Sequence, residues 1–324
     1  MCTAATYTTK DHYFGRNLDL ECSYNENVVV VPRNFPLNFK LMGSMERHYA
    51  MIGMALVMDG TPLFYDATNE KGLSIAGLNF PHSAFYGSEQ PDKDNIAAYE
   101  IIPWLLGQCA DLSQVRRLLD RMALVDMDFA PGVPPTPLHW MIADQSGSIV
   151  AEPTAEGLKV YDDPVGVLTN EPPFPFQMFH LNDHMQLSCE APRNSFAPGL
   201  ELKQYCLGMG AMGLPGDLSS ASRFVKAAFT RMNSVSGDDE AESVSQFFHI
   251  LGSVFQQRGC VHIEDDKYEI TVYSSCCNMD KGIYYYNTYG NSQIGAVDMH
   301  HEDLEGSAVI SYPLCRSQQF AYQN

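Results

Sequence analysis

The chain has 324 residues, of which 45% are hydrophobic and 18% are charged. This composition supplies enough apolar material for a sizeable core and excludes an intrinsically disordered protein. The formal net charge of −19 argues against partners such as nucleic acid or an anionic membrane surface. The N-terminus lacks a basic start followed by an apolar stretch, and no apolar run is long enough to span a bilayer. We therefore expect a cytoplasmic protein with no nucleic acid partner and no stable membrane association.

The N-terminal third of the chain predicts paired strands. Residues 2–9 and 13–20 flank the turn residues 10–12, an arrangement typical of a β-hairpin. Residues 25–34 indicate a further strand, which Pro32 stops. Three more strands, 48–58, 61–68 and 73–80, are separated by turn residues such as Asp59-Gly60 and predict a meander.

Helices and strands then alternate in blocks. Helical spacing predicts helices over 97–110, interrupted by Pro103, and over 112–122, capped by Asp111. The next strands are expected at 138–144, 148–154, 158–163 and 165–170. Two further helices follow, 219–232 behind serine caps and 240–259 ending at Gly259, before strands at 268–278 and 281–289.

This order of elements predicts an α+β fold. Long strands cluster in both halves of the chain, which favours a four-layer αββα sandwich: two stacked antiparallel sheets with helices outside. We expect residues 1–324 to form one domain, because no linker, repeat or low-complexity segment divides them. Strict alternation of strand and helix, which a doubly wound parallel sheet requires, is absent, and no glycine-rich nucleotide motif follows a strand.

The nine cysteines and ten histidines show no metal-binding pattern. No two cysteines form C-x-x-C, and the odd count in a long chain argues against a disulfide framework, so most cysteines are expected to be small buried residues. The histidines lack ligand spacing such as H-E-x-x-H. We expect no metal and no cofactor.

Cys2 stands where it can become the first residue of the mature protein. Methionine aminopeptidase generally removes Met1 before a small residue, which would leave Cys2 with a free α-amine whose ordinary pKa is roughly 7.7–8.0. One residue would then supply both a nucleophile and a base. The hairpin brings Asp19 near Cys2, with Arg16 a few residues further along, where a guanidinium favours the thiolate. A small second residue occurring by chance, and an ordinary surface ion pair, are the alternatives.

Motifs along the whole chain resemble the choloylglycine hydrolase family. They include "MCT", "FGRNLDLE", "NEKGLSIAGLNFP", "GVLTNEPPF", "GLPGDLSSASRFVKAAF" and "YSSCCNMDKGIYYYNTY". The family comprises bile salt hydrolases and penicillin V acylases, which are N-terminal-nucleophile hydrolases. "GLNFP" and "SRFVKAAF" favour the bile salt branch.

The resemblance implies a catalytic set of six residues. Cys2 matches the nucleophile, and Arg16 and Asp19 match the pair that positions and activates it. Asn79 and Asn170 match the two contributors to an oxyanion hole. Arg223 matches a basic partner beside the nucleophile.

The resemblance also implies a substrate and a pocket. The expected substrates are glycine- or taurine-conjugated bile salts, bound near six residues: Leu18, Met58, Tyr65, Phe129, Val133 and Leu138. A plain core role is the alternative for Leu18 and Leu138. By family analogy the protein forms a homo-oligomer, a tetramer. Two other functions stay open: an acylase acting on penicillin V or another N-acyl amide, and a non-catalytic steroid- or lipid-binding protein.

Overall fold

Two large antiparallel sheets form the centre of the molecule. The computed structural model describes residues 1–324. The first sheet has six strands in the order β14-β1-β2-β15-β16-β17. Their bounds are β1 Cys2–Thr8, β2 His12–Leu20, β14 Val167–Leu168, β15 Ile270–Asn278, β16 Ile283–Thr288 and β17 Asn291–Asp298. The hairpin expected around residues 10–12 is confirmed by the pairing of β1 with β2.

The second sheet has eight strands in the order β13-β12-β11-β8-β7-β6-β3-β18. Their bounds are β3 Asn27–Val31, β6 Met51–Met58, β7 Thr61–Asn69, β8 Ser74–Asn79, β11 Leu138–Asp144, β12 Gly147–Thr154, β13 Gly157–Asp162 and β18 Ile310–Pro313. The predicted meander is confirmed as β6-β7-β8. Asp59 and Gly60, which turn the chain between β6 and β7, both have positive φ, as this tight hairpin turn requires.

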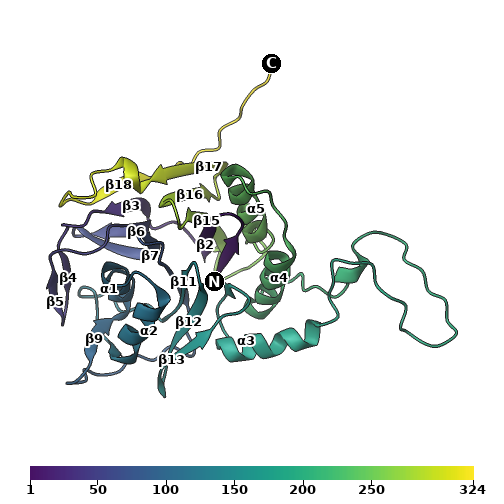
Figure 1. Cartoon of the computed structure of the whole chain (residues 1–324), viewed down its shortest axis with the longest axis horizontal. Helices are drawn as coiled ribbons and strands as arrows, with labels where there is room; N and C mark the ends of the chain where they lie inside the picture. The colour runs from purple at the N-terminus through teal and green to yellow at the C-terminus, as the bar shows by residue number, and fades with distance from the viewer.

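Helices cover the outer faces of both sheets (Figure 1). Helices α1 and α2 pack on the eight-stranded sheet, and α4 and α5 pack on the six-stranded sheet. The helices are α1 Ile101–Gln108, α2 Leu112–Asp120, α3 Phe174–His180, α4 Ser220–Asn233 and α5 Glu240–Gly252, with 3-10 turns at Ala98–Glu100, Leu181–His184, Met209–Ala211 and Met299–His301. Two small sheets pair β4 Leu37–Phe39 with β5 Gly43–Met45, and β9 Asp94–Ala97 with β10 Met122–Val125. The predicted α+β sandwich is confirmed.

Apolar side chains fill both sides of the eight-stranded sheet. In β3, Val28 and Val30 belong to the core cluster shared with the six-stranded sheet, whereas Val29 and Val31 belong to the cluster under α1 and α2. Successive side chains of a strand point to opposite faces. A strand of continuous valines is therefore the pattern required between two apolar layers.

Several local predictions were wrong. The helix expected at 240–259 ends at Gly252, and the helix expected at 97–110 is regular only over 101–108, with Pro103 in its first turn, where its missing N–H is not needed. Asp111 caps α2 as expected, but Ser219 makes no side-chain cap at α4. Only four cysteines are buried, and five are exposed: Cys22, Cys189, Cys206, Cys260 and Cys315.

The segment between α3 and α4 leaves the body of the molecule as a long loop (Figure 1). It carries exposed apolar side chains, among them Phe196, Tyr205 and Leu207, of which Leu207 is 94% exposed. We call residues 185–219 the arm. No helix combines the length and the apolar character that crossing a membrane requires.

Candidate active site

The register of the β1–β2 hairpin decides which side chains share a face. Cys2 lies opposite Leu18, and Ala4 lies opposite Arg16. Residues that face each other across an antiparallel pair point to the same side. Cys2, Leu18 and Arg16 therefore project from one face, and all three line the same cavity. Cys2 is only 3% exposed.

Asp19 projects from the opposite face, toward α4. Its carboxylate is fully buried. It accepts a hydrogen bond of 2.6 Å from the Thr271 hydroxyl and lies 3.9 Å from the Arg223 guanidinium. Burial raises the pKa of Asp19, and Arg223 acts in the opposite direction by favouring the carboxylate.

Arg223 joins the strand that carries Cys2 to the segment that carries Asn170. Its Nη1 donates to the Cys2 carbonyl and to the Thr3 hydroxyl, each at 2.6 Å, and its Nη2 donates to the Asn170 side-chain oxygen at 2.8 Å. One planar guanidinium thus fixes three groups at once through two separate nitrogens, a fork that the single nitrogen of a lysine does not offer. Sequence motifs alone gave no sign of these bonds.

Asn170 is in direct contact with Cys2. Its Oδ1 accepts from the Cys2 backbone nitrogen at 2.7 Å, and its Nδ2 donates to the Asn79 carbonyl, also at 2.7 Å. Ser220, expected as a helix cap, instead accepts from the Asn170 backbone nitrogen at 2.8 Å. The Glu171 carboxylate further ties this segment to the loop after Asn79, by accepting from the backbone nitrogen of Ser83 at 2.9 Å.

Sequence reasoning missed Asp66, a buried carboxylate below Arg16. Asp66 accepts hydrogen bonds from the hydroxyls of Tyr273 and Tyr284, at 2.6 Å and 2.7 Å. Arg16 donates to the Tyr65 carbonyl at 3.0 Å, while its Nε and Nη2 are buried without a partner. Burial opposes the charge of Arg16, but nearby anionic groups, including Asp66, outweigh this effect and raise the pKa of Arg16. The sequence feature that could have revealed Asp66 is a single charged residue within the largely apolar strand β7.

We expect Asp66→Asn to lower the free energy of unfolding by about 3–5 kcal/mol, because it removes a buried negative charge that favours the buried Arg16 guanidinium. Chemical denaturation measures this change. Tyr273→Phe is the control: it removes one hydrogen bond to Asp66 but keeps the Asp66 charge, and it should cost about 1–3 kcal/mol. Equal losses in the two variants would contradict an electrostatic role for Asp66.

A cavity of about 490 Å³ opens beside Cys2, and 16 of its 22 lining residues are hydrophobic. All six residues predicted for the pocket line it: Leu18, Met58, Tyr65, Phe129, Val133 and Leu138. Asn79 lines it as well. Sequence reasoning missed further lining residues, including Tyr24, Tyr99 and Trp140. Leu20 could have been found from the strand period, because it lies two residues beyond Leu18.

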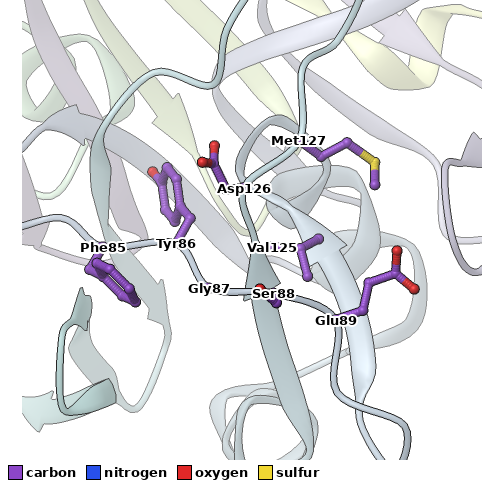
Figure 2. Close-up of a pocket in the computed structure, with 8 residues that line it drawn as sticks. All are labelled: Phe85, Tyr86, Gly87, Ser88, Glu89, Val125, Asp126 and Met127. Atoms are coloured by element: carbon purple, nitrogen blue, oxygen red, sulfur yellow. The ribbon is translucent and has the colours of Figure 1, made fainter.

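A second hollow, of about 570 Å³, lies between residues 85–89 and 125–127 (Figure 2). It contains the acidic side chains of Glu89 and Asp126 and none of the residues predicted for catalysis or substrate binding. An apolar enclosure with a few polar or reactive groups in its wall is the arrangement expected of a site for a large apolar ligand. The cavity beside Cys2 has this arrangement and the second hollow does not.

Met1 is present in this structure, so the Cys2 nitrogen belongs to a peptide bond. The Met1 ammonium donates to the Asp19 carbonyl at 2.8 Å and forms an ion pair with Glu269. Burial lowers the pKa of the Met1 amine.

No group of three or more histidine, cysteine or acidic side chains is placed to hold a metal ion. His139, one of the histidines considered in the sequence, is buried. It contacts the Glu152 carboxylate at 3.1 Å and stacks on Phe80. Its role is therefore structural packing next to the segment that carries Asn170.

The chain is similar to known proteins over most of its length. The family model for linear amide C–N hydrolases, choloylglycine hydrolase family, matches residues 2–312. A bile salt hydrolase/transferase from Lactiplantibacillus plantarum is 53% identical over 320 residues, 99% of each chain. A mutant of the conjugated bile acid hydrolase from Clostridium perfringens has a structure with a TM-score of 0.92, 39% identity and full coverage of both chains. Penicillin V acylase from Agrobacterium tumefaciens shares the fold, with a TM-score of 0.75 and 18% identity over 96% of this chain and 90% of that chain.

Proposed function

Because the chain belongs to the choloylglycine hydrolase family of linear amide C–N hydrolases, we propose that it hydrolyses the amide bond of glycine- or taurine-conjugated bile salts. Its fold is that of the N-terminal-nucleophile hydrolases. The observation that carries the proposal is the apolar cavity with Cys2, Arg16 and Asn79 in its wall. A steroid nucleus is large, flat and apolar, and this enclosure suits it.

The reaction begins with removal of Met1, which frees the α-amine of Cys2. The Cys2 thiol gives its proton to the α-amine, its sulfur attacks the amide carbon, and the carbonyl oxygen becomes an oxyanion. The side-chain amide of Asn79 and the second hydrogen of the Asn170 Nδ2 group are the donors that stabilise it. One such donor is worth about 3–4 kcal/mol in the transition state.

The α-amine then carries the proton that the leaving group needs. It protonates the departing nitrogen of glycine or taurine as the C–N bond breaks, which leaves a thioester on Cys2. The same amine, now neutral, takes a proton from water as the water attacks the thioester. The free bile acid leaves and the thiol is restored. Arg16 and Arg223 supply local positive charge in a chain whose net charge is −19.

One assay separates this function from its alternatives. The protein is incubated with glycocholate, taurocholate and penicillin V, and release of free amine is followed. Cleavage of the two bile salts supports the proposal. Cleavage of penicillin V alone would make the chain an acylase of another amide, and bile acid binding without cleavage would make it a non-catalytic binding protein.

The name of one relative suggests a second reaction at the same thioester. The 53% identical relative is a hydrolase/transferase by name. If an amino acid replaces water as the attacking group, the bile acid moves to a new amine. Incubation of glycocholate with excess alanine would then yield the alanine conjugate. Absence of that conjugate during rapid hydrolysis would restrict the chain to hydrolysis.

We expect Phe129→Ala to raise KM for glycocholate and taurocholate about tenfold to a hundredfold, with little change in kcat, because a buried phenyl ring contributes about 1.5–3 kcal/mol. Steady-state kinetics measures both constants. Phe85→Ala is the matched control, because Phe85 lines the second hollow (Figure 2). A similar KM change in the two variants would contradict binding in the cavity beside Cys2.

We further propose a cytoplasmic homo-oligomer, a tetramer by analogy with the family. All nine cysteines are free thiols, as is usual for proteins of a reducing compartment. The arm supports assembly, because an isolated chain rarely leaves so many large apolar side chains in solvent. Light scattering after gel filtration measures the mass. A mass of one chain would refute the oligomer.

A further inference from the structure

Glu269 is a buried carboxylate beside the N-terminus. Its ionic partner, the Met1 ammonium, belongs to a residue that the proposed function requires to be removed. It lies directly before β15 and is 6% exposed. Its side chain forms an ion pair with the Met1 ammonium. Under the proposed function, on which this inference rests, Met1 is removed. The mature protein would then hold a buried carboxylate without its cation, and an uncompensated buried charge is strongly destabilising.

Glu269 lies just before β15, and its side chain points toward the N-terminus. Thr271 pairs with Asp19 in the register of β15 and β2 and donates to the Asp19 carboxylate. Glu269 precedes Thr271 by two residues, which is the period of a strand. The two side chains therefore follow one another toward the Cys2 end of the hairpin.

The freed Cys2 amine is a cation that can replace the Met1 ammonium beside Glu269. The Met1 and Cys2 nitrogens are separated by three covalent bonds, so they lie about 3 Å apart. We propose that Glu269 is a positioning residue for the α-amine of Cys2 in the mature enzyme. It accepts a hydrogen bond from the ammonium, directly or through one water where the Met1 nitrogen lies now. It thereby holds the amine beside the nucleophile in its proton-carrying form.

Other charged groups act on the terminal amine, which in this structure is the amine of Met1. Arg16 and Asp19 come from β2, Arg223 comes from α4, and the Cys2 thiol belongs to the same residue. Glu21, just after β2, also interacts electrostatically with the terminal amine and with Lys267. The two arginines favour the neutral amine, whereas Asp19 and Glu269 favour the ammonium. Glu269 is the member of this set that loses its own partner when Met1 leaves.

The pH dependence of kcat/KM tests this role. The thiol and the amine titrate as a coupled pair, so both limbs of the bell-shaped profile belong to the pair. Removing a nearby negative charge makes each of their protons easier to lose. We therefore expect Glu269→Gln to move both limbs to lower pH by about one unit, with the melting temperature close to that of the parent.

Three further variants make the result decisive. Glu269→Asp keeps the charge, so both limbs of its profile should lie close to those of the parent. Glu269→Met removes the charge without burying an unpaired amide, and it replaces the glutamine variant if that chain does not fold. Glu264→Gln removes an exposed charge that pairs with Lys267 and should leave both limbs in place.

Two results would overturn the proposal. One is a profile of Glu269→Gln or Glu269→Met that superimposes on the parent's. The other is a loss of activity that is equal at every pH and accompanied by a lower melting temperature, which is the mark of a purely structural residue. Failure of the proposed function is a separate outcome: the parent would not cleave bile salts, and the profile would be measured on whichever amide it does cleave.

Discussion

A chain with any peptide bond on the Cys2 nitrogen is expected to lose at least about 10⁴-fold in amide hydrolysis, because it keeps the thiol but has no terminal amine. Losses of this size accompany removal of one member of a nucleophile–base unit. The test uses one protein twice: a cleavable extension is fused before Cys2, and activity is measured before and after a protease cuts directly ahead of Cys2.

Cleavage of the extension should restore full activity. Cys2→Ala with the extension cleaved is the control, and it should stay inactive because the amine remains while the nucleophile is gone. Full activity of the uncut fusion would show that the amine is not the base. The structure gives the physical reason for the expectation: the Cys2 nitrogen already lies 2.7 Å from the Asn170 side-chain oxygen, a partner able to hold a free amine in the same place.

Arg223→Met is expected to cost about 3–5 kcal/mol of unfolding free energy, since it leaves the fully buried Asp19 carboxylate 3.9 Å from where its cation was. It should also abolish measurable hydrolysis, because the bonds to the Cys2 carbonyl and to Asn170 are lost with the guanidinium. Chemical denaturation and amine release measure the two effects.

The double variant Arg223→Met/Asp19→Asn shows whether the two charges act as a pair. It should be destabilised by about 1–3 kcal/mol less than the sum of the single variants, because both charges leave together. The exposed pair Arg116–Asp162 is the control and should show a coupling of only about 0–1 kcal/mol. Strict additivity for Arg223 and Asp19 would mean that their proximity has no energetic effect.

The local part of the site was predictable from sequence, and the rest was not. A turn at residues 10–12 fixes the hairpin, and the hairpin fixes Cys2 relative to Arg16 and Asp19. Asn79, Asn170 and Arg223 come from three distant segments, so only the resemblance to a family brought them together. The roles assigned to these six residues remain predictions until the variants are measured.

Other features carry no local signature. Asp66 and Thr271 act through partners far along the chain, and a single polar residue within a strand does not reveal its partner. The end of α5 was missed for a related reason. Apolar residues continue through Val254 and Phe255, but the chain leaves the helix so that the Gln256 nitrogen can donate to the Thr271 hydroxyl at 2.8 Å. A tertiary hydrogen bond overrides the helical pattern there.

The contacts of Met1 imply an order of events during synthesis. In the folded chain, the Asp19 backbone and Glu269 hold the Met1 ammonium, and the Met1 carbonyl accepts from the Asp19 nitrogen. An aminopeptidase must reach this residue while the hairpin is still open. Glu269 is separated from Met1 by 268 positions, so the ribosome makes it long after the N-terminus has emerged. We therefore expect removal of Met1 and folding to compete, and under the proposed mechanism a chain that folds first would keep its methionine and be inactive.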